Sequence, residues 1–384
     1  MTRAISLANE AGHWVSSEGN GSMALHLSTR MVVAGLSAVL AAPTAEAAVA
    51  PSPAGRILAH HVACAPAPEP LIALANQTSY QTGDATFSKV DDAREAIRRA
   101  QIAPLVDLTR RTATYANRYV RSQGRDTASG ACVLRWLDQW ARADAMQRML
   151  THDAQFVRAV NLSGWALAYA QVARLEIAGD DPRPRILAWF ARMADDLRRH
   201  HDGLTNTTAR NNHRYWAGLA AMAVGRVTQD RGLRDWALAS ARIGLAQVNA
   251  EGALPLELAR GERARHYHLY AATPLVMTAE LALIDRVDLY RDHGGALRRL
   301  VRFATGSIGD PSRMASLSGA KQLPFVDPRG AFFGQMVAWY EYYGRRFAGE
   351  PGGGAILTHR PLVNAEIGGD ITLLASQTTA TPRP

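Results

Sequence analysis

The sequence predicts an all-α protein, and three observations lead to that prediction. Apolar residues recur at spacings of three and four positions through most of the region from residue 91 to residue 343. The breaks between these runs carry Gly, Asp, Asn or Pro, which end helices and form turns, as at 179–182 and 249–252. No run alternates apolar and polar residues as a strand does, and no βαβ alternation appears, which disfavours a Rossmann or TIM-barrel architecture.

Nine segments carry the helical spacing, and the short loops between them predict antiparallel neighbouring helices. These segments are 92–122, 130–149, 154–177, 184–199, 212–226, 233–249, 266–286, 292–304 and 329–345. Most of them contain a tryptophan, which more often fills a core than forms a sugar-stacking surface. We therefore predict one helical domain over 87–373, followed by a mobile tail at 374–384.

The chain begins with features of a secretory signal peptide. An apolar run follows Arg30 and ends in small residues, and Ala45-Glu46-Ala47 offers a cleavage site. The run is too short for a membrane-spanning helix, which needs about 20 apolar residues. We expect residues 1–47 to be removed, with Met23 as an alternative start, and the mature protein to be periplasmic without membrane insertion. Residues 48–86, which are rich in Pro, Ala and Thr, are expected to form an extended N-terminal segment.

The charge balance indicates a polyanionic partner. The 384 residues include 43 Lys and Arg against 34 Asp and Glu, a net charge of +9. Removal of the signal peptide leaves 41 against 31, or +10. Lysine occurs only at Lys89 and Lys321, so the cationic surface is formed almost entirely by arginine. Nucleic acid, anionic lipid or an acidic polysaccharide would each fit this charge, and export out of the cytoplasm argues against nucleic acid.

The two cysteines, Cys64 and Cys132, both follow the predicted cleavage site. In an oxidising compartment they can form a disulfide, and closing a loop of about 70 residues would stabilise the fold by on the order of 4 kcal/mol. The alternative is two free buried thiols. Two cysteines alone cannot build a structural zinc site.

The first polar cluster lies at the start of a predicted helix. It reads Asn211-Asn212-His213-Arg214-Tyr215-Trp216 and precedes a small apolar run. One Asn would be enough to cap the helix, so the additional Asn, His, Tyr and Trp favour the wall of a binding cleft.

A second cluster follows Leu254-Pro255-Leu256-Glu257-Leu258 and contains Arg263, Tyr267, His268 and Tyr270. Arg263 and Tyr270 are seven residues apart, so on one helix they would share a face. A solvated basic stripe is an equally good explanation for this cluster taken alone.

Together the clusters supply an amide, an imidazole, a guanidinium and a phenol, without the carboxylate pair that a glycoside hydrolase normally needs. There is no phosphate-binding loop, no nucleophile elbow and no His-Glu-x-x-His zinc helix, and adjacent histidines at 60–61 and 200–201 make poor metal pairs. Donors and cations that neutralise a uronate carboxylate favour removal of the neighbouring C5 proton. A phenol beside an arginine can take that proton and return one to the leaving oxygen. The residues therefore predict a polysaccharide lyase that needs neither metal nor cofactor.

These motifs resemble the periplasmic alginate lyases of polysaccharide lyase family 5. The resemblance rests on the two clusters, including Ala217 and Ala271, and on Ser88-Lys89, with weaker matches at 136–145 and 368–372. The matches run in order from about residue 87 to residue 373. The resemblance implies an α/α toroid, an incomplete barrel of antiparallel helix pairs with a deep cleft.

The resemblance also implies roles for individual residues. Asn212, His213 and Arg263 would neutralise the C5 carboxylate, and Tyr270 would be general base and acid in syn elimination from a mannuronate. His213 would instead be the base where the proton lies on the opposite face. The remaining expected substrate contacts are Lys89 of a lid loop, Trp216, Asn211, Tyr215, Tyr267 and His268.

The expected activity is cleavage of alginate, with polymannuronate preferred, to 4,5-unsaturated oligouronides by a monomeric protein. Two alternatives stay open: a lyase for glucuronan or another glucuronate-containing polymer, and a non-catalytic protein that binds anionic polysaccharide. The chain departs from the family pattern in a shorter lid after Lys89 and in the segment 305–330. These departures affect closure of the cleft and fine specificity.

Overall fold

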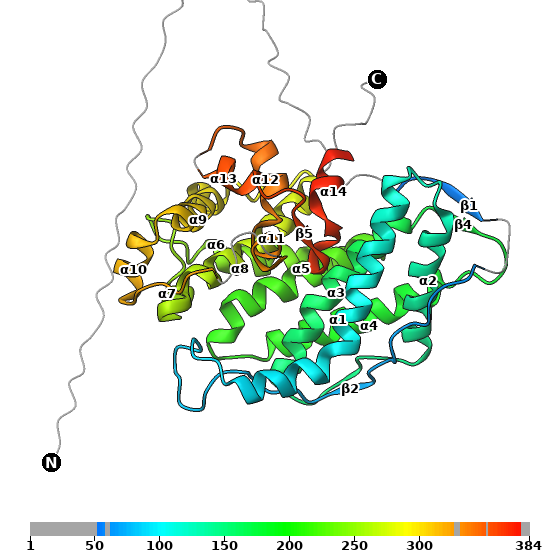
Figure 1. Ribbon diagram of the computed structural model, residues 1–384, viewed down its shortest axis with the longest axis horizontal. Helices are drawn as coiled ribbons and strands as arrows, with labels where there is room; N and C mark the ends of the chain where they lie inside the picture. The colour runs from blue at the N-terminus through cyan, green and yellow to red at the C-terminus, as the bar shows by residue number, and fades with distance from the viewer. Residues whose placement is uncertain (1–51, 58–61, 326–330, 351, 378–384) are drawn as a thin grey trace, which may run out of the picture. The chain divides into compact units, whose positions relative to one another are not determined.

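The computed structural model describes residues 52–57, 62–325, 331–350 and 352–377 (Figure 1). The predicted signal peptide at 1–47 and the last seven residues of the predicted tail lie outside the described residues. Helices make up most of the described chain, so the all-α prediction is confirmed. Within the described ranges, no helix is both long and apolar enough to cross a membrane.

Eight long helices form the body of the structure. They are α1 (Asp92–Arg121), α2 (Thr127–Arg142), α3 (His152–Val172), α4 (Arg183–Asp202), α5 (Asn212–Val227), α6 (Arg231–Leu245), α8 (Ala264–Leu283) and α9 (Asp292–Gly309). Shorter helices are α7 (Pro255–Leu258), α10 (Ser312–Ser318), α11 (Ala331–Val337), α12 (Tyr340–Arg346), α13 (Gly353–Leu357) and α14 (Ile371–Gln377). Three 3₁₀ turns are η1 (Thr207–Arg210), η2 (Gly261–Arg263) and η3 (Ala365–Ile367).

Several long helices begin where a side chain caps the first turn. An Asp, Thr or Asn oxygen accepts a hydrogen bond from a main-chain N–H two or three residues later, which satisfies a donor that has no partner inside the helix. The capping residues are Asp91, Asp126, Thr151, Asn211 and Asp230.

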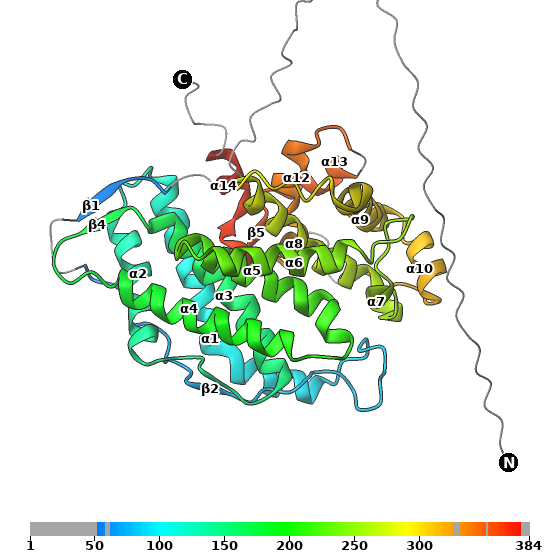
Figure 2. The same ribbon diagram turned by 180° about the vertical axis from the view of Figure 1, so that it is seen from behind.

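Burial separates inner helices from outer ones. In α8, 18 of 20 residues are buried, and in α3, 16 of 21, whereas α4 buries only 7 of its 20. A helix that is apolar on all sides lies in the interior, and one with a single apolar stripe covers it. Accordingly α5 packs against both α3 and α8, while α4 and α6 cover these helices from outside (Figure 2). The predicted site residues on α5 and α8 are therefore carried by helices that are buried over most of their length.

Two predicted helices are shorter than the sequence spacing indicated. The segment 130–149 ends as a helix at Arg142, because Asp144 and Met146 adopt positive φ angles of 49° and 60° and turn the chain. Strand β3 (Arg148–Met149) then pairs in parallel with β2 (Ala73–Leu74). The segment 154–177 likewise ends in a strand, β4 (Leu175–Ile177), which pairs with β1 (Gly55–Ile57). The partner strands come from the N-terminal segment, which local spacing cannot reveal.

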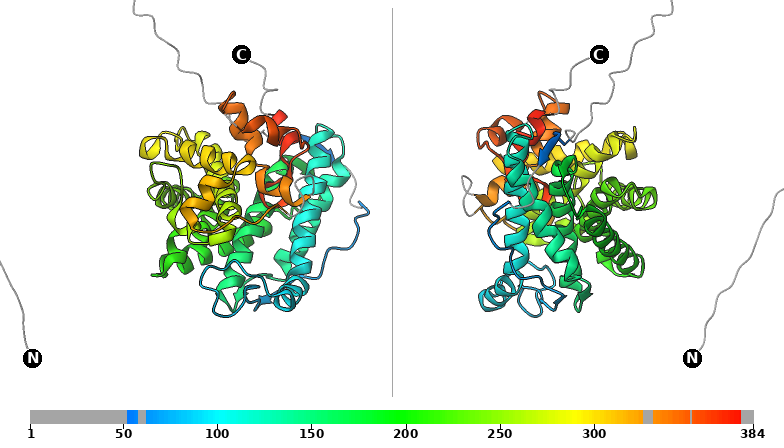
Figure 3. Two further views of the ribbon diagram at one scale, coloured as in Figure 1. Left: turned by 60° about the vertical axis from the view of Figure 1, so that its left-hand side comes forward. Right: turned by 90° about the vertical axis from the view of Figure 1, so that its right-hand side faces the viewer.

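The prediction of one continuous helix at 329–345 is also wrong, because the structure divides its described part into two helices, α11 and α12. The last strands, β5 (Val363–Asn364) and β6 (Gly369–Asp370), form an antiparallel pair that frames η3. Figure 3 shows the C-terminal helices, in orange and red, lying beside the start of the helical body in cyan. The last elements of the described chain thus lie against its first helix, α1.

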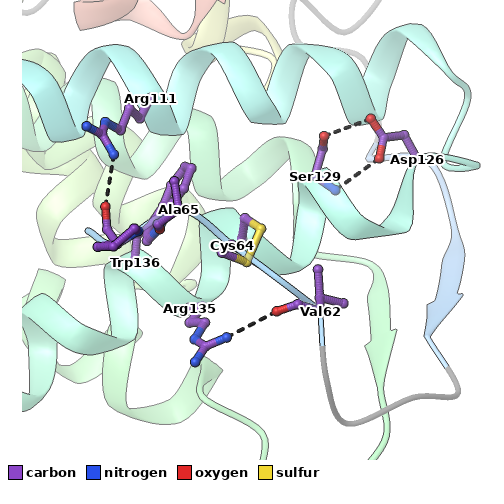
Figure 4. Close-up of a disulfide and its surroundings, with 10 residues drawn as sticks. Val62, Cys64, Ala65, Arg111, Asp126, Ser129, Arg135 and Trp136 are labelled. Atoms are coloured by element: carbon purple, nitrogen blue, oxygen red, sulfur yellow. Dashed lines mark hydrogen bonds between the residues drawn. A yellow bond between two sulfur atoms is a disulfide. The ribbon is translucent and has the colours of Figure 1, made fainter. Parts of the chain in front are cut away.

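The N-terminal segment lies along α2 and is linked to it covalently. Cys64 and Cys132 form a disulfide (Figure 4). The indole N–H groups of Trp136 and Trp140 donate to the main-chain oxygens of Ala65 and Pro68, at 2.8 and 2.9 Å. These two tryptophans therefore pack in the core and also hold the N-terminal segment by hydrogen bonds.

Candidate active site

The first turn of α5 is built on Asn211. Its side-chain oxygen accepts a hydrogen bond from the main-chain N–H of His213 at 3.0 Å, so Asn211 is the N-cap. This geometry places Asn212 and His213 in the first turn of the helix. Asn212 is fully buried, whereas His213 is half-buried.

A buried carboxyl group lies against Asn212. Glu257, on the short helix α7, is fully buried, and its Oε1 accepts from the main-chain N–H of Asn212 at 2.9 Å. The Asn212 Nδ2 lies 3.1 Å from each Glu257 oxygen, and Arg260 Nε lies 3.8 Å from Oε2. Burial raises the pKa of Glu257, while Arg260 and Asn212 oppose that rise. Glu257 belongs to a motif noted in the sequence, but the sequence assigned it no role.

Two residues of α3 hold the ring of His213. His152 stacks on it with ring centroids 5.4 Å apart, and Phe156, one helical turn later, approaches to 4.1 Å. Burial lowers the pKa of His213 well below its ordinary value, and the charges of His152 and Arg260 lower it further. His213 is therefore a neutral imidazole near neutral pH.

Tyr270 lies on α8. The centroid of its ring is 5.1 Å from that of Trp216 and 6.2 Å from that of Phe156. Burial raises the pKa of its phenol well above the ordinary value, the charge of Glu366 adds to the rise, and Arg98 opposes it. From the sequence, a neighbouring arginine was expected to favour the phenolate. In the structure the arginine that lowers the pKa of Tyr270 is Arg98 rather than Arg263, and burial outweighs its charge, so Tyr270 is a protonated phenol.

Arg263 contacts the loop that carries Lys89. Its Nε donates to the main-chain oxygen of Ser88, and the phenols of Tyr80 and Tyr267 hydrogen bond at 2.7 Å. A bridge between Tyr80 and Val90 closes this loop. The predicted lid loop thus packs directly on the residues at the start of α8.

The lid loop is organised around one carboxylate, that of Asp84. Its oxygens accept from the main-chain N–H groups of Thr86, Ser88 and Lys89 at 3.0, 2.7 and 2.7 Å. These bonds, led by that of Lys89, hold the pKa of Asp84 well below its usual range. The Lys89 side chain itself is exposed.

Four of the predicted substrate-binding residues are buried, and their contacts are within the protein. Tyr215 donates its hydroxyl to the oxygen of Arg210 at 2.9 Å, and Trp216 is fully buried beside Tyr270. His268 is fully buried, with its Nε2 accepting from Leu254 N–H at 3.0 Å and its Nδ1 lying 2.7 Å from the oxygen of Ala264. Asn211, the fourth, is occupied as the cap. These residues shape the site from behind, while His213, Arg263, Tyr267 and Tyr270 retain exposed surface.

Two charged groups near Tyr270 were not predicted from the sequence. Arg98 comes from α1, and Glu366 from η3 close to the end of the described chain. Burial raises the pKa of Glu366 to about 7, against a hydrogen bond from Gln335 and the charge of Arg98. Neither residue lies in a local pattern that would identify it; a weak signal for Glu366 is its position just before Gly368-Gly369.

Buried polar atoms without a hydrogen-bond partner gather at this site. Within the described part of the chain they include Asn212 Oδ1, His213 Nδ1, Trp216 Nε1 and Glu366 Oε2. Native structures leave few such atoms unpaired, so each one needs an explanation, and binding sites are one. No group of three or more His, Cys, Asp or Glu residues suited to a metal ion occurs among the described residues.

A cavity of about 410 Å³ lies elsewhere, between α3, α5 and α8. Leu167, Ala223, Leu281 and Arg226 are among its lining residues, and none of the predicted site residues lines it. It is mostly apolar, and it therefore does not resemble a site for a charged sugar chain.

Inner and outer helices, with His213 and Tyr270 on the inner ones and Arg263 in η2 just before α8, fit a helical polysaccharide lyase of the α/α toroid class. The chain belongs to the alginate lyase family, whose model matches residues 77–314.

Two relatives agree with this assignment, and solved structures share the fold. A polysaccharide lyase of Stenotrophomonas maltophilia is 34% identical over 82% of this chain and 91% of its own length. An alginate lyase of Azotobacter vinelandii is 32% identical over 84% and 86%. Alginate lyase A1-III of Sphingomonas species A1 is 24% identical, covers 87% of this chain and 90% of its own, and has a TM-score of 0.68. A histidine-to-alanine variant of A1-III with a tetrasaccharide gives a TM-score of 0.70 at 22% identity, covering 83% and 86%. The predicted toroid is confirmed as the fold.

Proposed function

We propose that the protein is an alginate lyase that cleaves polymannuronate in preference to polyguluronate by metal-independent β-elimination. The observation that carries the β-elimination is a protonated phenol, Tyr270, and a neutral imidazole, His213, whose rings both contact Phe156. The preference for polymannuronate rests on the resemblance of the sequence motifs. Burial opposes ionisation of Tyr270 and of His213 alike, which leaves one proton donor and one proton acceptor near neutral pH. β-Elimination requires an acceptor for the C5 proton and a donor of a proton to the leaving O4.

In the proposed reaction, the C5 carboxylate of the sugar lies against Arg263, Asn212 and His213. The positive charge of Arg263 and the hydrogen-bond donors of Asn212 and His213 stabilise the negative charge that develops when the C5 proton leaves. Tyr270 gives a proton to the departing O4, and the C4–O4 bond breaks as the C4–C5 double bond forms. For mannuronate, Tyr270 is also the base in syn elimination and must first lose its proton to solvent; where the C5 proton lies on the opposite face, His213 is the base.

The relatives' names support the substrate class. The Azotobacter vinelandii relative is an alginate lyase, and the Stenotrophomonas maltophilia relative a polysaccharide lyase. The net charge of +9 suits an anionic polymer, and Lys89 lies on the exposed lid loop, where it can contact one. We further propose that the protein is periplasmic, which the apolar run before Ala47 and the disulfide support, and that it is a monomer.

Ultraviolet absorbance tests the proposal, because the new double bond is conjugated with the carboxylate. Purified protein is mixed with polymannuronate, polyguluronate or glucuronan, with and without a chelator. We expect the fastest rise with polymannuronate, unchanged by the chelator. A faster rise with glucuronan would move the assignment to a glucuronate polymer, and tight binding without any rise would leave a non-catalytic binding protein.

A further inference from the structure

The side-chain amide of Asn212 is held in one orientation by Glu257. Its Nδ2 lies 3.1 Å from both carboxyl oxygens of Glu257, and its Oδ1 is buried without a partner among the described residues. An ionised carboxylate accepts hydrogen bonds but cannot donate one. Ionised Glu257 therefore holds the NH₂ end of the amide and turns its oxygen away.

This orientation conflicts with the role that elimination gives to Asn212. The carboxylate of a uronate is an acceptor, so it needs an N–H from Asn212, and an amide oxygen facing it would repel it. A neutral Glu257 removes the conflict. Its O–H can donate to Asn212 Oδ1, which turns the NH₂ end to the position that the oxygen now occupies. The bond from the Asn212 main-chain N–H to Oε1, at 2.9 Å, is kept in both arrangements.

We propose that Glu257 is a positioning residue for the reaction proposed above, and this role rests on that proposed function. Glu257 takes up one proton when a uronate binds and donates a hydrogen bond to Asn212 Oδ1. As a result, Asn212 Nδ2 faces the sugar carboxylate. The proton comes from solvent and stays on Glu257. No covalent bond other than that O–H is made or broken in this step.

The surroundings of Glu257 favour its neutral form. The side chain is fully buried, and burial raises its pKa. Tyr215 on α5 and Tyr267 on α8 also face it, and both are uncharged phenols whose pKa burial raises well above its ordinary value. Arg260, at 3.8 Å, is the cation that opposes protonation. A bound uronate adds a negative charge nearby, which favours the neutral acid further.

Glu257→Gln tests the proposal directly, because glutamine copies the neutral acid. Its amide N–H can donate to Asn212 Oδ1 and its oxygen can accept from the Asn212 main chain. We expect Glu257→Gln to keep kcat/KM within about threefold of the parent enzyme, and Glu257→Ala to lose about tenfold or more, mainly through KM.

Proton uptake gives a second readout that needs no turnover. Binding of a mannuronate oligomer to Tyr270→Phe is followed by calorimetry in two buffers with different ionisation heats. We expect uptake of up to one proton per site, and its loss in the Tyr270→Phe, Glu257→Gln double variant. Equal proton uptake in the two proteins, or Glu257→Gln as impaired as Glu257→Ala, would overturn the proposal.

Glu280→Gln is the matched control. Glu280 is a buried carboxyl outside the site that accepts from Tyr290 Oη at 2.7 Å and pairs with Arg346 at 2.8 Å. We expect this variant to have a lower Tm but unchanged KM and proton uptake; a changed KM would show that any buried Glu→Gln replacement disturbs the site, and so would overturn the specific role of Glu257. A parent protein that turns over no uronate polymer, yet binds one with proton uptake, would contradict the proposed function without contradicting the role of Glu257.

Discussion

Tyr270 and His213 show how one physical effect prepares two different groups. The charged form of a phenol is an anion and that of an imidazole is a cation, and burial disfavours both. The pKa of Tyr270 therefore rises while that of His213 falls. Both groups remain neutral over a wide range of pH around neutrality.

Replacement of Tyr270 by Phe removes the proton donor and keeps the ring that packs on Trp216 and Phe156. We expect kcat to fall by about 10² or more with a much smaller change in KM, because the lost group acts on the transition state. Initial rates of absorbance increase on polymannuronate measure both constants.

Tyr169→Phe is the control for that change. Tyr169 is also buried on an inner helix, and burial raises the pKa of its phenol to about 12, but it lies by the apolar cavity rather than the site. Its removal should leave kcat unchanged. Near-normal activity of Tyr270→Phe would exclude Tyr270 as the proton-transferring group.

At the residue scale, local sequence led to part of the predicted site. Asn212, His213 and Tyr270 were singled out because crowded polar residues at a helix start, and an Arg and a Tyr seven apart, are unusual beside apolar runs. The structure places Arg263 in η2, just before α8, rather than on the helix of Tyr270. Arg98 and Glu366 were not singled out, because each reaches Tyr270 only after helices from distant parts of the chain pack together. The direction of the pKa shift of Tyr270 could not be predicted either, since it depends on how deeply the phenol is buried.

At the element scale, a single glycine sets the position of η3. A Cβ on Gly164 of α3 would lie 2.6 Å from the main-chain oxygen of Ala365 and 3.1 Å from Glu366 Cα. The neighbouring Ser163 donates its hydroxyl to the Glu366 main-chain oxygen at 2.8 Å. Close approach of η3 to α3 is therefore what brings Glu366 to the site.

Gly164→Ala should displace η3. We expect a loss of about 1–3 kcal/mol of unfolding free energy from overpacking, together with lower kcat because Glu366 moves relative to Tyr270. Urea unfolding and steady-state kinetics on the same preparation measure the two effects.

The matched variant is Gly306→Ala in α9, where a Cβ meets no atom within 4 Å. There the gain in helix propensity, up to about 1 kcal/mol, should appear with unchanged kinetics. Equal effects of the two substitutions would contradict the role given to Gly164.

The spacing of apolar residues predicted a helix well where that helix simply packs one face on the core. The helix predicted at 212–226 is α5, Asn212–Val227. The spacing failed where a distant segment supplies the partner. The predicted helices at 130–149 and 154–177 ran past the true helix ends, because the last residues of these segments form strands that pair with β2 and β1. Strands of two or three residues are too short to show a periodicity.

At the scale of the whole molecule, the N-terminal segment is bound along the helical body by its disulfide and by the indoles of Trp136 and Trp140. The bridge closes a loop of 68 residues. In the chain-entropy account, such a loop stabilises the folded state by on the order of 4 kcal/mol.

A Cys64→Ser, Cys132→Ser double variant should lose stability of about that size. The native structure should form all the same, since the indole hydrogen bonds remain, and kcat at low temperature should change little because the bridge is remote from Tyr270. Guanidinium unfolding of oxidised parent and double variant measures the difference. A loss below about 1 kcal/mol would contradict the entropic account of the bridge.

The meeting of the two ends of the described chain has a consequence for how the protein can be used. Tyr80 near one end touches Tyr267, and Glu366 near the other acts on Tyr270, so the two ends complete one site. A chain cut between α9 and α11 separates Glu366 from Tyr80 and Tyr270, and reassociation of the halves brings these residues together again. Catalysis could therefore serve as the reporter in a split-protein complementation assay.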